Sequence, residues 1–195
     1  MIKKISSGES LFLQGLTIIT LLGELDYANF LESDYFSKME YKDEEYKLLI
    51  EKTGIGNTAL FQMMLYTLLV LPKELGVYED TKFLDNINKK IDNLVQKTET
   101  FTTYKKDFKN KDYDMDYLRH IRNAVSHGRC EYSNYNDKKY FVVFKDQNPN
   151  DEKQKCQIKI ETDKINEIIL MLRNRLVEYL KGKHDLKELA RNLKI

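Results

Sequence analysis

The sequence predicts a mainly α-helical bundle of four to five main helices, with a small β-hairpin inserted before the last long helix. Two observations carry this prediction. Apolar residues recur every three to four positions over several long stretches, as on the buried face of a helix. One later segment, Tyr140 to Phe144, is instead β-branched and aromatic, which is typical of a strand. With 195 residues, of which 42% are hydrophobic, the chain is long enough for a full core, so we expect residues 1–195 to form a single domain.

The first predicted helix runs from Glu9 to about Asp34, with Ser7 or Ser10 as its cap. Its apolar residues occur at mixed three- and four-residue steps, which indicates burial over much of the circumference: Leu11, Phe12, Ile18, Ile19, Leu22 and Leu25. A more exposed helix is expected over Met39 to Lys52, followed by a break at the two glycines of Thr53 to Asn57.

A second strong helix is predicted from Thr58 to about Leu71. We expect it to stop or kink near Pro72, because an interior proline costs a helix about 3 kcal/mol. A third amphipathic stripe predicts a helix over Thr81 to Val95, and the Thr- and Lys-rich interval after it is expected to be a loop or a fraying helix end.

The hairpin is expected at about residues 138–162, since Cys156, Ile158 and Ile160 alternate with polar residues as in a second strand. Its polar connection, Asp146 to Lys155, is predicted to be a surface loop. A final long helix should be capped by Thr162 or Asp163 and end at Gly182, with a short helix at about 184–195.

The charge is nearly balanced, with 32 basic and 31 acidic side chains, so any contact with nucleic acid must be local. The two cysteines are too few for a disulfide scaffold or a zinc site, and we expect free thiols in a cytoplasmic protein. The apolar stretch Leu11 to Leu22 is too short to span a bilayer, and the acidic residues after it argue against export. The sequence shows no metal-ligand set, so neither a metal nor a cofactor is expected.

The most informative segment is Leu118 to Arg129, which contains two of the three histidines and three arginines. On a helix, Leu118, Ile121 and Val125 form a core face. The opposite polar arc contains, in angular order, Arg122, Ser126, Arg119, Asn123, His127 and His120. Arg122 and His127 lie roughly 140° apart around the axis and about 7.5 Å apart along it, and they bracket this arc. Gly128 is expected to loosen or end the helix and let the imidazole swing toward the arginine, and Asn123 to orient the His127 ring.

These residue types suit phosphoryl transfer, because arginine binds phosphate oxygens with a planar fork and histidine exchanges a proton near neutral pH. Attack of an RNA 2′-hydroxyl on its own phosphate needs a base, an acid and positive charge, but no metal. One histidine cannot easily make both proton transfers. A two-fold dimer that joins two such helices supplies a second one.

The run Arg122-Asn123-Ala124-Val125-Ser126-His127-Gly128 resembles the signature of the HEPN superfamily, in which an arginine precedes a histidine by four to six positions at a helix end. The resemblance implies an HEPN-like helical bundle and a metal-independent endoribonuclease that leaves a 2′,3′-cyclic phosphate and a 5′-hydroxyl. It also implies a homodimer with a composite active site, with Arg122 and His127 as the catalytic pair.

Further expectations attach to the same segment. Arg119, His120, Asn123, Ser126 and Arg129 are candidates for supporting the site or binding RNA. A toxin or antiphage defence role is implied at the level of the family, with any antitoxin or regulatory partner left unidentified. In HEPN toxins controlled by nucleotidyltransferase antitoxins a tyrosine follows the histidine by two positions, whereas this chain has Arg129 there, which argues against such an antitoxin.

Two alternatives stay open from the sequence. In one, the same fold binds a nucleotide or RNA without cutting it. In the other, the polar arc of Leu118 to Arg129 only forms a dimer interface or caps a helix end with basic residues.

Overall fold

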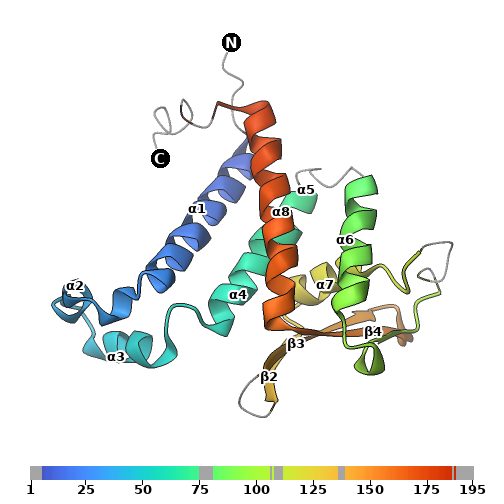
Figure 1. Ribbon diagram of the computed structural model, residues 1–195, viewed down its shortest axis with the longest axis horizontal. Coiled ribbons are helices and arrows are strands. Elements are labelled where there is room, and N and C mark those ends of the chain that lie inside the picture. The colour runs from blue at the N-terminus through green and yellow to red at the C-terminus, as the bar shows by residue number, and fades with distance from the viewer. Residues whose placement is uncertain are drawn as a thin grey trace.

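The computed structural model describes residues 6–74, 81–105, 107, 112–135, 139–185 and 187. The protein is mainly helical, with one small four-stranded antiparallel sheet (Figure 1). This agrees with the predicted helical fold, whereas the sheet has two strands more than the predicted hairpin.

The first helix, α1 (Ser7–Tyr27), is shorter than predicted and is capped by Ser6 rather than by Ser7 or Ser10. The Ser6 hydroxyl accepts a hydrogen bond from the Glu9 amide, and the Glu9 carboxylate accepts one from the Ser6 amide, which is a capping box. Beyond α1 the chain forms a 3₁₀ turn (Phe30–Glu32) and two short helices, α2 (Asp34–Ser37), which buries Phe36, and α3 (Glu44–Thr53), which has no buried residue.

The second strong helix begins at Thr58 as predicted, but it does not stop at Pro72. It consists of α4 (Thr58–Leu65), a π-helical turn (Tyr66–Val70) and α5 (Leu71–Glu74). The wider π turn lies directly before the proline. A helix can therefore pass Pro72, which lacks an amide hydrogen, because the hydrogen-bond pattern has already changed there.

Helix α6 (Thr81–Leu94) matches the third predicted helix. The segment after it was expected to be a loop, but it holds a 3₁₀ turn (Lys97–Glu99) and a short strand, β1 (Phe101–Thr102). Helix α7 (Tyr117–Ser126) contains the arginine- and histidine-rich segment.

Strands β2 (Cys130–Tyr135), β3 (Lys139–Asn148) and β4 (Asp151–Glu161) complete the sheet, in the order β1-β4-β3-β2. Strands β3 and β4 form the predicted hairpin. The predicted loop Asp146 to Lys155 was wrong, because strand pairing continues to Asn148 and resumes at Asp151, so the turn is only Pro149 and Asn150. Polar residues extend this ladder because one face of the sheet is open to solvent.

The last helix, α8 (Thr162–Lys183), already includes both predicted caps, Thr162 and Asp163, in its first turn. Its N-cap residue is Glu161, and no side chain caps it. Gly182 lies within its last turn rather than ending it. The predicted short helix at 184–195 falls almost wholly outside the described residues, and the single-domain assignment stays a prediction.

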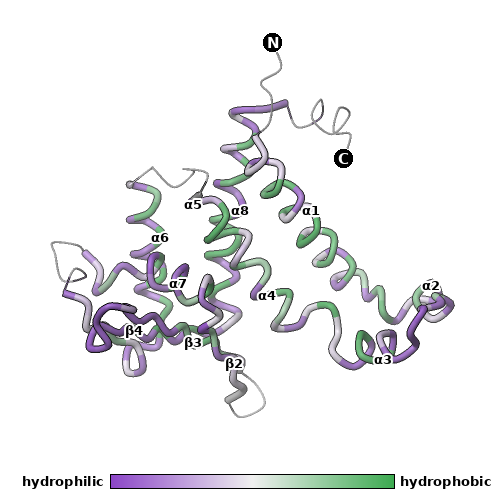
Figure 2. The backbone as a smooth tube through the Cα atoms, turned by 180° about the vertical axis from the view of Figure 1, so that it is seen from behind, coloured by the Kyte–Doolittle hydropathy of each residue, from purple (hydrophilic) through white to green (hydrophobic). Residues whose placement is uncertain are grey.

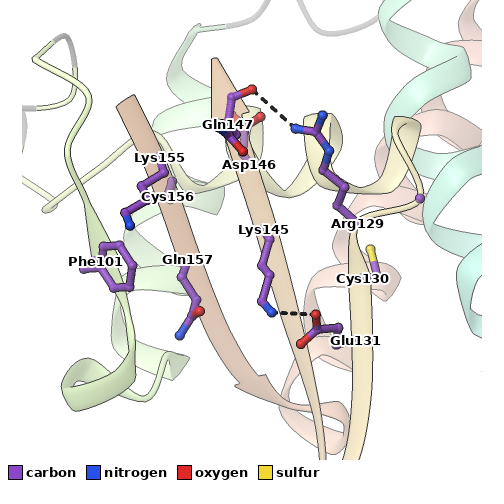
Figure 3. A pocket seen from close by; sticks show the side chains of 11 residues that line it. Phe101, Arg129, Cys130, Glu131, Lys145, Asp146, Gln147, Lys155, Cys156 and Gln157 are labelled. Carbon is purple, nitrogen blue, oxygen red and sulfur yellow. Dashed lines mark hydrogen bonds and ion pairs between the residues drawn. The ribbon is translucent and has the colours of Figure 1, made fainter. Parts of the chain in front are cut away.

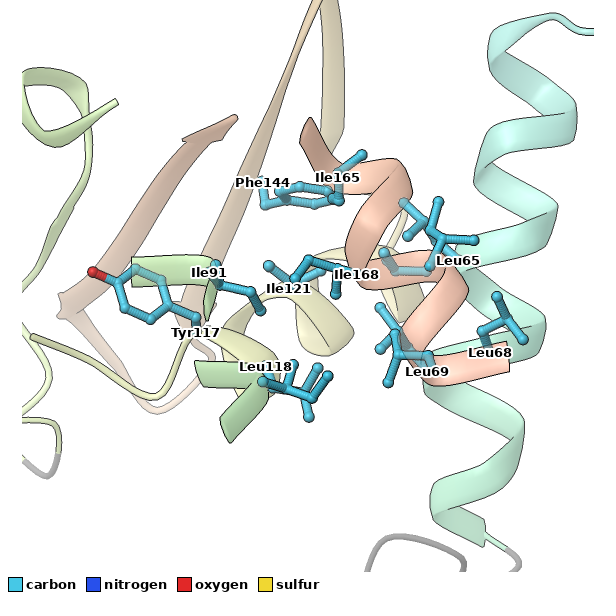
Figure 4. Close-up of a cluster of buried hydrophobic side chains, with 14 of the residues drawn as sticks. Leu65, Leu68, Leu69, Ile91, Tyr117, Leu118, Ile121, Phe144, Ile165 and Ile168 are labelled. Atoms are coloured by element: carbon cyan, nitrogen blue, oxygen red, sulfur yellow. The ribbon is translucent and has the colours of Figure 1, made fainter. Parts of the chain in front are cut away.

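The core lies where α7 packs between the sheet, α6, α8 and the α4–α5 helix (Figure 4). Its most deeply buried members include Leu68, Ile91, Tyr117, Ile121 and Phe144, each at most 2% exposed. The start of α1 and the end of α8 meet at one end of the molecule, while α2 and α3 lie at the far end of α1, away from the sheet (Figure 1). The apolar residues follow α1, α4 and α5, and the strands are mostly hydrophilic (Figure 2).

Within the described ranges no single helix is long and apolar enough to cross a membrane. The helical runs Glu44–Thr53 and Thr58–Lys73 meet that test only as a pair, and they are bent by 80° relative to each other.

Candidate functional site

The N-terminus of α7 is fixed by two polar side chains. Asp116 is the N-cap and accepts a hydrogen bond from the Arg119 amide. Asn88 of α6, only 2% exposed, accepts a hydrogen bond of 2.8 Å from the Leu118 amide and donates one to Asp116. The start of the helix is therefore held in place by a neighbouring helix.

The C-terminus of α7 ends in a Schellman motif. The Arg129 amide donates to the Ala124 carbonyl at 2.8 Å, and the Gly128 amide donates to the Val125 carbonyl at 3.3 Å. Gly128 has a φ of +64°, in the left-handed region that favours glycine. The prediction that Gly128 ends the helix directly after His127 is confirmed: His127 is the C-cap residue.

The predicted polar arc is not one continuous surface. Ser126, His127 and Arg129 are exposed, and Arg122 is half-buried, so this part of the arc meets solvent. His120 is 1% exposed, and the side chains of Arg119 and Asn123 turn toward the sheet and the loop after β1. The helical projection alone did not reveal that the side of α7 with Arg119, His120 and Asn123 also packs against the rest of the protein.

His120 lies between two buried carboxylates. Its Nδ1 atom is 2.7 Å from Oδ2 of Asp146 on β3, and its Nε2 atom is 2.8 Å from Oδ2 of Asp107. The Arg119 guanidinium donates to the other oxygen of Asp107 at 2.5 Å, and the Asn123 amide donates to Asp146 at 3.1 Å. These five residues, which we call the buried ion network, tie α7 to the sheet.

The titration of the network follows from this geometry. Burial disfavours the charged imidazolium, but the hydrogen bonds to Asp107 and Asp146 outweigh it, and the pKa of His120 is raised. Burial also disfavours the charged carboxylates, but the same bonds hold the pKa values of Asp107 and Asp146 below their usual range. The network is therefore built from charged groups of both signs.

Two residues of the β1 region complete this environment. The Thr102 hydroxyl donates to Asp107 at 2.6 Å, and the Tyr104 ring lies 4.6 Å from the His120 ring. Burial, together with the charge of Asp146 and a hydrogen bond to it, raises the pKa of Tyr104 to about 12. The hydroxyl of Tyr104 thus stays protonated.

Asp107 and Asp146 are the members of the network that the sequence analysis did not select. The signal for Asp146 was its register, since Val142 and Phe144 precede it at two-residue steps on the buried face of β3. A carboxylate on that face requires a partner. No comparable periodic signal marked Asp107, which lies in the loop after β1.

The Arg122 and His127 side chains belong to the last turns of α7. The Asn123 side chain does not orient the His127 ring as expected, because its amide is bonded to Asp146. Among the described residues, no hydrogen-bond or ion-pair partner is placed against the His127 imidazole. The His127 ring is therefore accessible to solvent.

A pocket of about 490 Å³ lies directly beside this helix end (Figure 3). It is lined by Gly128 and Arg129, which follow His127, and by residues of all four strands. The described part of the chain contains no group of three or more His, Cys, Asp or Glu residues placed to hold a metal ion.

A family model described as HEPN pEK499 p136 matches residues 14–185, which include α7 and the whole sheet. The chain belongs to this HEPN family. Comparison with curated proteins and with solved structures returned no match. Membership of the HEPN family indicates an RNase-like or nucleotide-binding function, and enzymes of RNase type are frequent in it. In this HEPN protein the Arg122 to Gly128 motif forms the C-terminal end of α7, and its last three residues are exposed.

Proposed function

We propose that this HEPN protein is a metal-independent endoribonuclease with Arg122 and His127 as its catalytic pair. The observation that carries the proposal is the position of His127: it is the exposed C-cap of α7, whereas His120 and Asn123 of the same helix are bonded to Asp146. A histidine that has no hydrogen-bond or ion-pair partner among the described residues, with a half-buried arginine on the preceding turn, is available to a substrate.

The reaction begins when the RNA 2′-hydroxyl attacks the adjacent phosphorus. His127 takes the 2′-hydroxyl proton or delivers one to the departing 5′-oxygen, and the Arg122 guanidinium stabilises the charge that develops on the phosphoryl oxygens. The products are a 2′,3′-cyclic phosphate and a 5′-hydroxyl. Arg129 and Ser126, both exposed at the same helix end, are placed to bind flanking phosphate and sugar groups.

Two imidazoles are needed if one acts as base and another as acid, so the proposal includes a homodimer that juxtaposes two α7 ends. An exposed aromatic residue lies on the α4–α5 helix, which is hydrogen-bonded to this end. Gln62 of α4 donates a hydrogen bond to the Val125 carbonyl at 3.3 Å, and Tyr66, one turn later on the same side, is 44% exposed. We place the dimer contact at this surface.

The test is incubation with mixed RNA in the presence of EDTA, followed by analysis of product ends. We expect cyclic-phosphate ends from the wild type and none from His127→Gln or Arg122→Ala. Arg173→Ala, an exposed arginine on α8, is the matched control and should cut normally. Circular dichroism and urea unfolding check that each variant folds.

Cleavage that EDTA abolishes, or full activity in both motif variants, would refute the proposal. A wild type that binds RNA but yields no new ends would instead show the non-cleaving binding module. We extend the proposal to a toxin or antiphage defence role in the cytoplasm on the basis of the HEPN resemblance alone.

A further inference from the structure

The solvent-facing side of the sheet carries an arrangement that the catalytic pair does not use. Val142, Phe144 and Asp146 on β3 are at most 5% exposed and face the helices. The alternate residues Lys145 and Gln147 therefore face outward. On β4 the same alternation buries Cys156 and Ile158 and turns Lys155 and Gln157 outward.

Strand register brings outward residues into a row. Phe101 of β1 is paired with Gln157, and Gln157 is paired with Lys145. The Lys145 amide donates to the Arg129 carbonyl at 3.0 Å, which extends the row to the residue that follows Gly128. With neighbouring strands about 4.8 Å apart, the row from Phe101 to Arg129 spans about 14 Å.

This row and its neighbours line the pocket of about 490 Å³ (Figure 3). Phe101 is 42% exposed at one side of the pocket, and Arg129 lies at the other. Gln147 and Gln157 add amide groups between them. The pocket thus has an aromatic ring, amides and cations on one surface.

The charge of the pocket is positive although the chain as a whole is nearly neutral. Lys145 is paired with Glu131 at 2.5 Å, and the Arg129 guanidinium donates to the Gln147 carbonyl at 3.4 Å. The carboxylate of Asp146 is turned inward to His120. Lys155 is exposed and makes no ion pair with any described residue. Arg129 and Lys155 therefore remain as net positive charge.

We propose that this outer face of β1, β4 and β3 is a binding surface for single-stranded RNA that leads to the α7 end. A base stacks on Phe101 and the backbone phosphates lie along Lys155 and Arg129, which combines the two features by which proteins hold single strands without reading sequence. The inference rests on the proposed ribonuclease function, because it assigns the strand on this face to the substrate of Arg122 and His127.

Continuity with the motif supports this choice of ligand. Gly128 and Arg129 line the pocket and directly follow His127 in the chain. A strand bound here has its next phosphate close to the helix end. Paired bases of a duplex are not free to stack on Phe101, so the surface should favour single strands.

The experiment measures binding of the full chain to a short fluorescent 2′-O-methyl oligoribonucleotide. This probe cannot be cut by 2′-hydroxyl attack, so binding is measured without turnover. Affinity is recorded over a series of salt concentrations for the wild type, Phe101→Ala and Lys155→Gln. Tyr27→Ala and Lys42→Gln are the matched controls, since both residues are exposed at the α1–α3 end of the molecule.

The two variants have different expected signatures. Phe101→Ala should weaken binding by about 5- to 150-fold, the usual worth of one stacked base, and leave the salt dependence unchanged. Lys155→Gln should reduce the slope of log affinity against log salt by about 0.7, the value for one phosphate contact on a single strand. The controls should match the wild type.

Wild-type binding in both Phe101→Ala and Lys155→Gln would overturn the inference, as would equal losses in the controls or no binding of the probe at all. Cleavage by the wild type together with unaltered binding in both variants would reject this surface and leave the nuclease proposal standing. If the wild type never cuts RNA but both variants bind the probe more weakly, the binding surface would be supported and the nuclease proposal rejected.

Discussion

The Nδ1 atom of His120 lies 2.7 Å from the Oδ2 atom of Asp146, and both side chains are at most 4% exposed. This contact joins the middle of α7 to the buried face of β3. Asp146 also accepts a hydrogen bond from Asn123, a residue of the motif. The sheet and the motif helix are thus connected by buried charge rather than by apolar packing alone.

Asp146→Asn should strongly destabilise the fold. The variant leaves the His120 imidazolium with one carboxylate instead of two, and removal of one partner from a buried ion pair costs about 3 to 5 kcal/mol. Urea unfolding at about pH 5, below the ordinary imidazole pKa, measures the loss.

Asp112→Asn is the control for that prediction. Asp112 pairs with Lys89 at 2.8 Å, but its side chain is 83% exposed, so solvent screens the pair. Its free energy of unfolding should stay close to that of the wild type. Equal effects of Asp146→Asn and Asp112→Asn would contradict the role of the buried ion network.

The stability gained from His120 should depend on pH with a definite sign. The raised pKa means that the folded state holds the proton more tightly than the unfolded state. The stabilisation is therefore complete below the ordinary imidazole pKa of about 6.5 and is lost as the pH rises through the raised value.

The measurement is the difference in unfolding free energy between the wild type and His120→Gln across the pH range. The difference should shrink on the alkaline side. It should also shrink in strong acid, because the lowered pKa values of Asp107 and Asp146 add stability that is lost as the pH falls through them. A difference that is constant with pH would show that the pKa of His120 is the same in the folded and unfolded states, and a difference that grows on the alkaline side would show that His120 is neutral in the folded protein.

Gly128→Ala should destabilise the protein by about 1 to 2 kcal/mol. Nothing lies within 4 Å of a Cβ added at Gly128, so the cost is the strain of a non-glycine residue at a φ of +64°. Gly128→Asn should cost less, because asparagine tolerates this conformation better than alanine does.

Gly182→Ala should have the opposite sign. Gly182 lies in the last turn of α8, again with nothing within 4 Å of an added Cβ, and alanine is favoured over glycine inside a helix by roughly 0.5 to 1 kcal/mol. Thermal unfolding of both variants is the measurement. Stabilisation by Gly128→Ala would disprove the Schellman turn.

Tyr66→Asp should separate the proposed dimer and abolish cleavage together. A charge introduced on this exposed aromatic residue of the α4–α5 helix would be buried against its own copy across a two-fold axis. Tyr46→Asp on α3, where the side chain is 63% exposed, is the matched control. Sedimentation and the cleavage assay are read side by side, and an active wild-type monomer would rule out the composite site.

The long apolar stripes made most helices predictable. The boundaries at Thr58 and Thr81 follow from where each stripe begins, whereas Thr162 was predicted as a cap and is the first residue of α8. Strands β1 and β2 were missed because one has two residues and the other carries Glu131, Ser133 and Asn134, so neither has an apolar pattern of its own. Both form because an existing strand offers unpaired backbone groups, which local propensity does not reveal.

The candidate site was likewise predictable only in part. The core face of Leu118, Ile121 and Val125 is buried as the helical projection predicts. Which polar side chains of α7 are buried depends on residues distant in the chain: Asp107 and Asp146, the partners of His120, lie 13 and 26 positions from it. A single-helix projection contains no information on such partners.

The turn at Gly128 joins His127 to the first residue of β2, with two residues between them. So short a connection, hydrogen-bonded at both ends, fixes the backbone of His127 relative to the sheet. The helix end and the sheet therefore move together, and a ligand that binds the sheet also sets the position from which the His127 side chain reaches out.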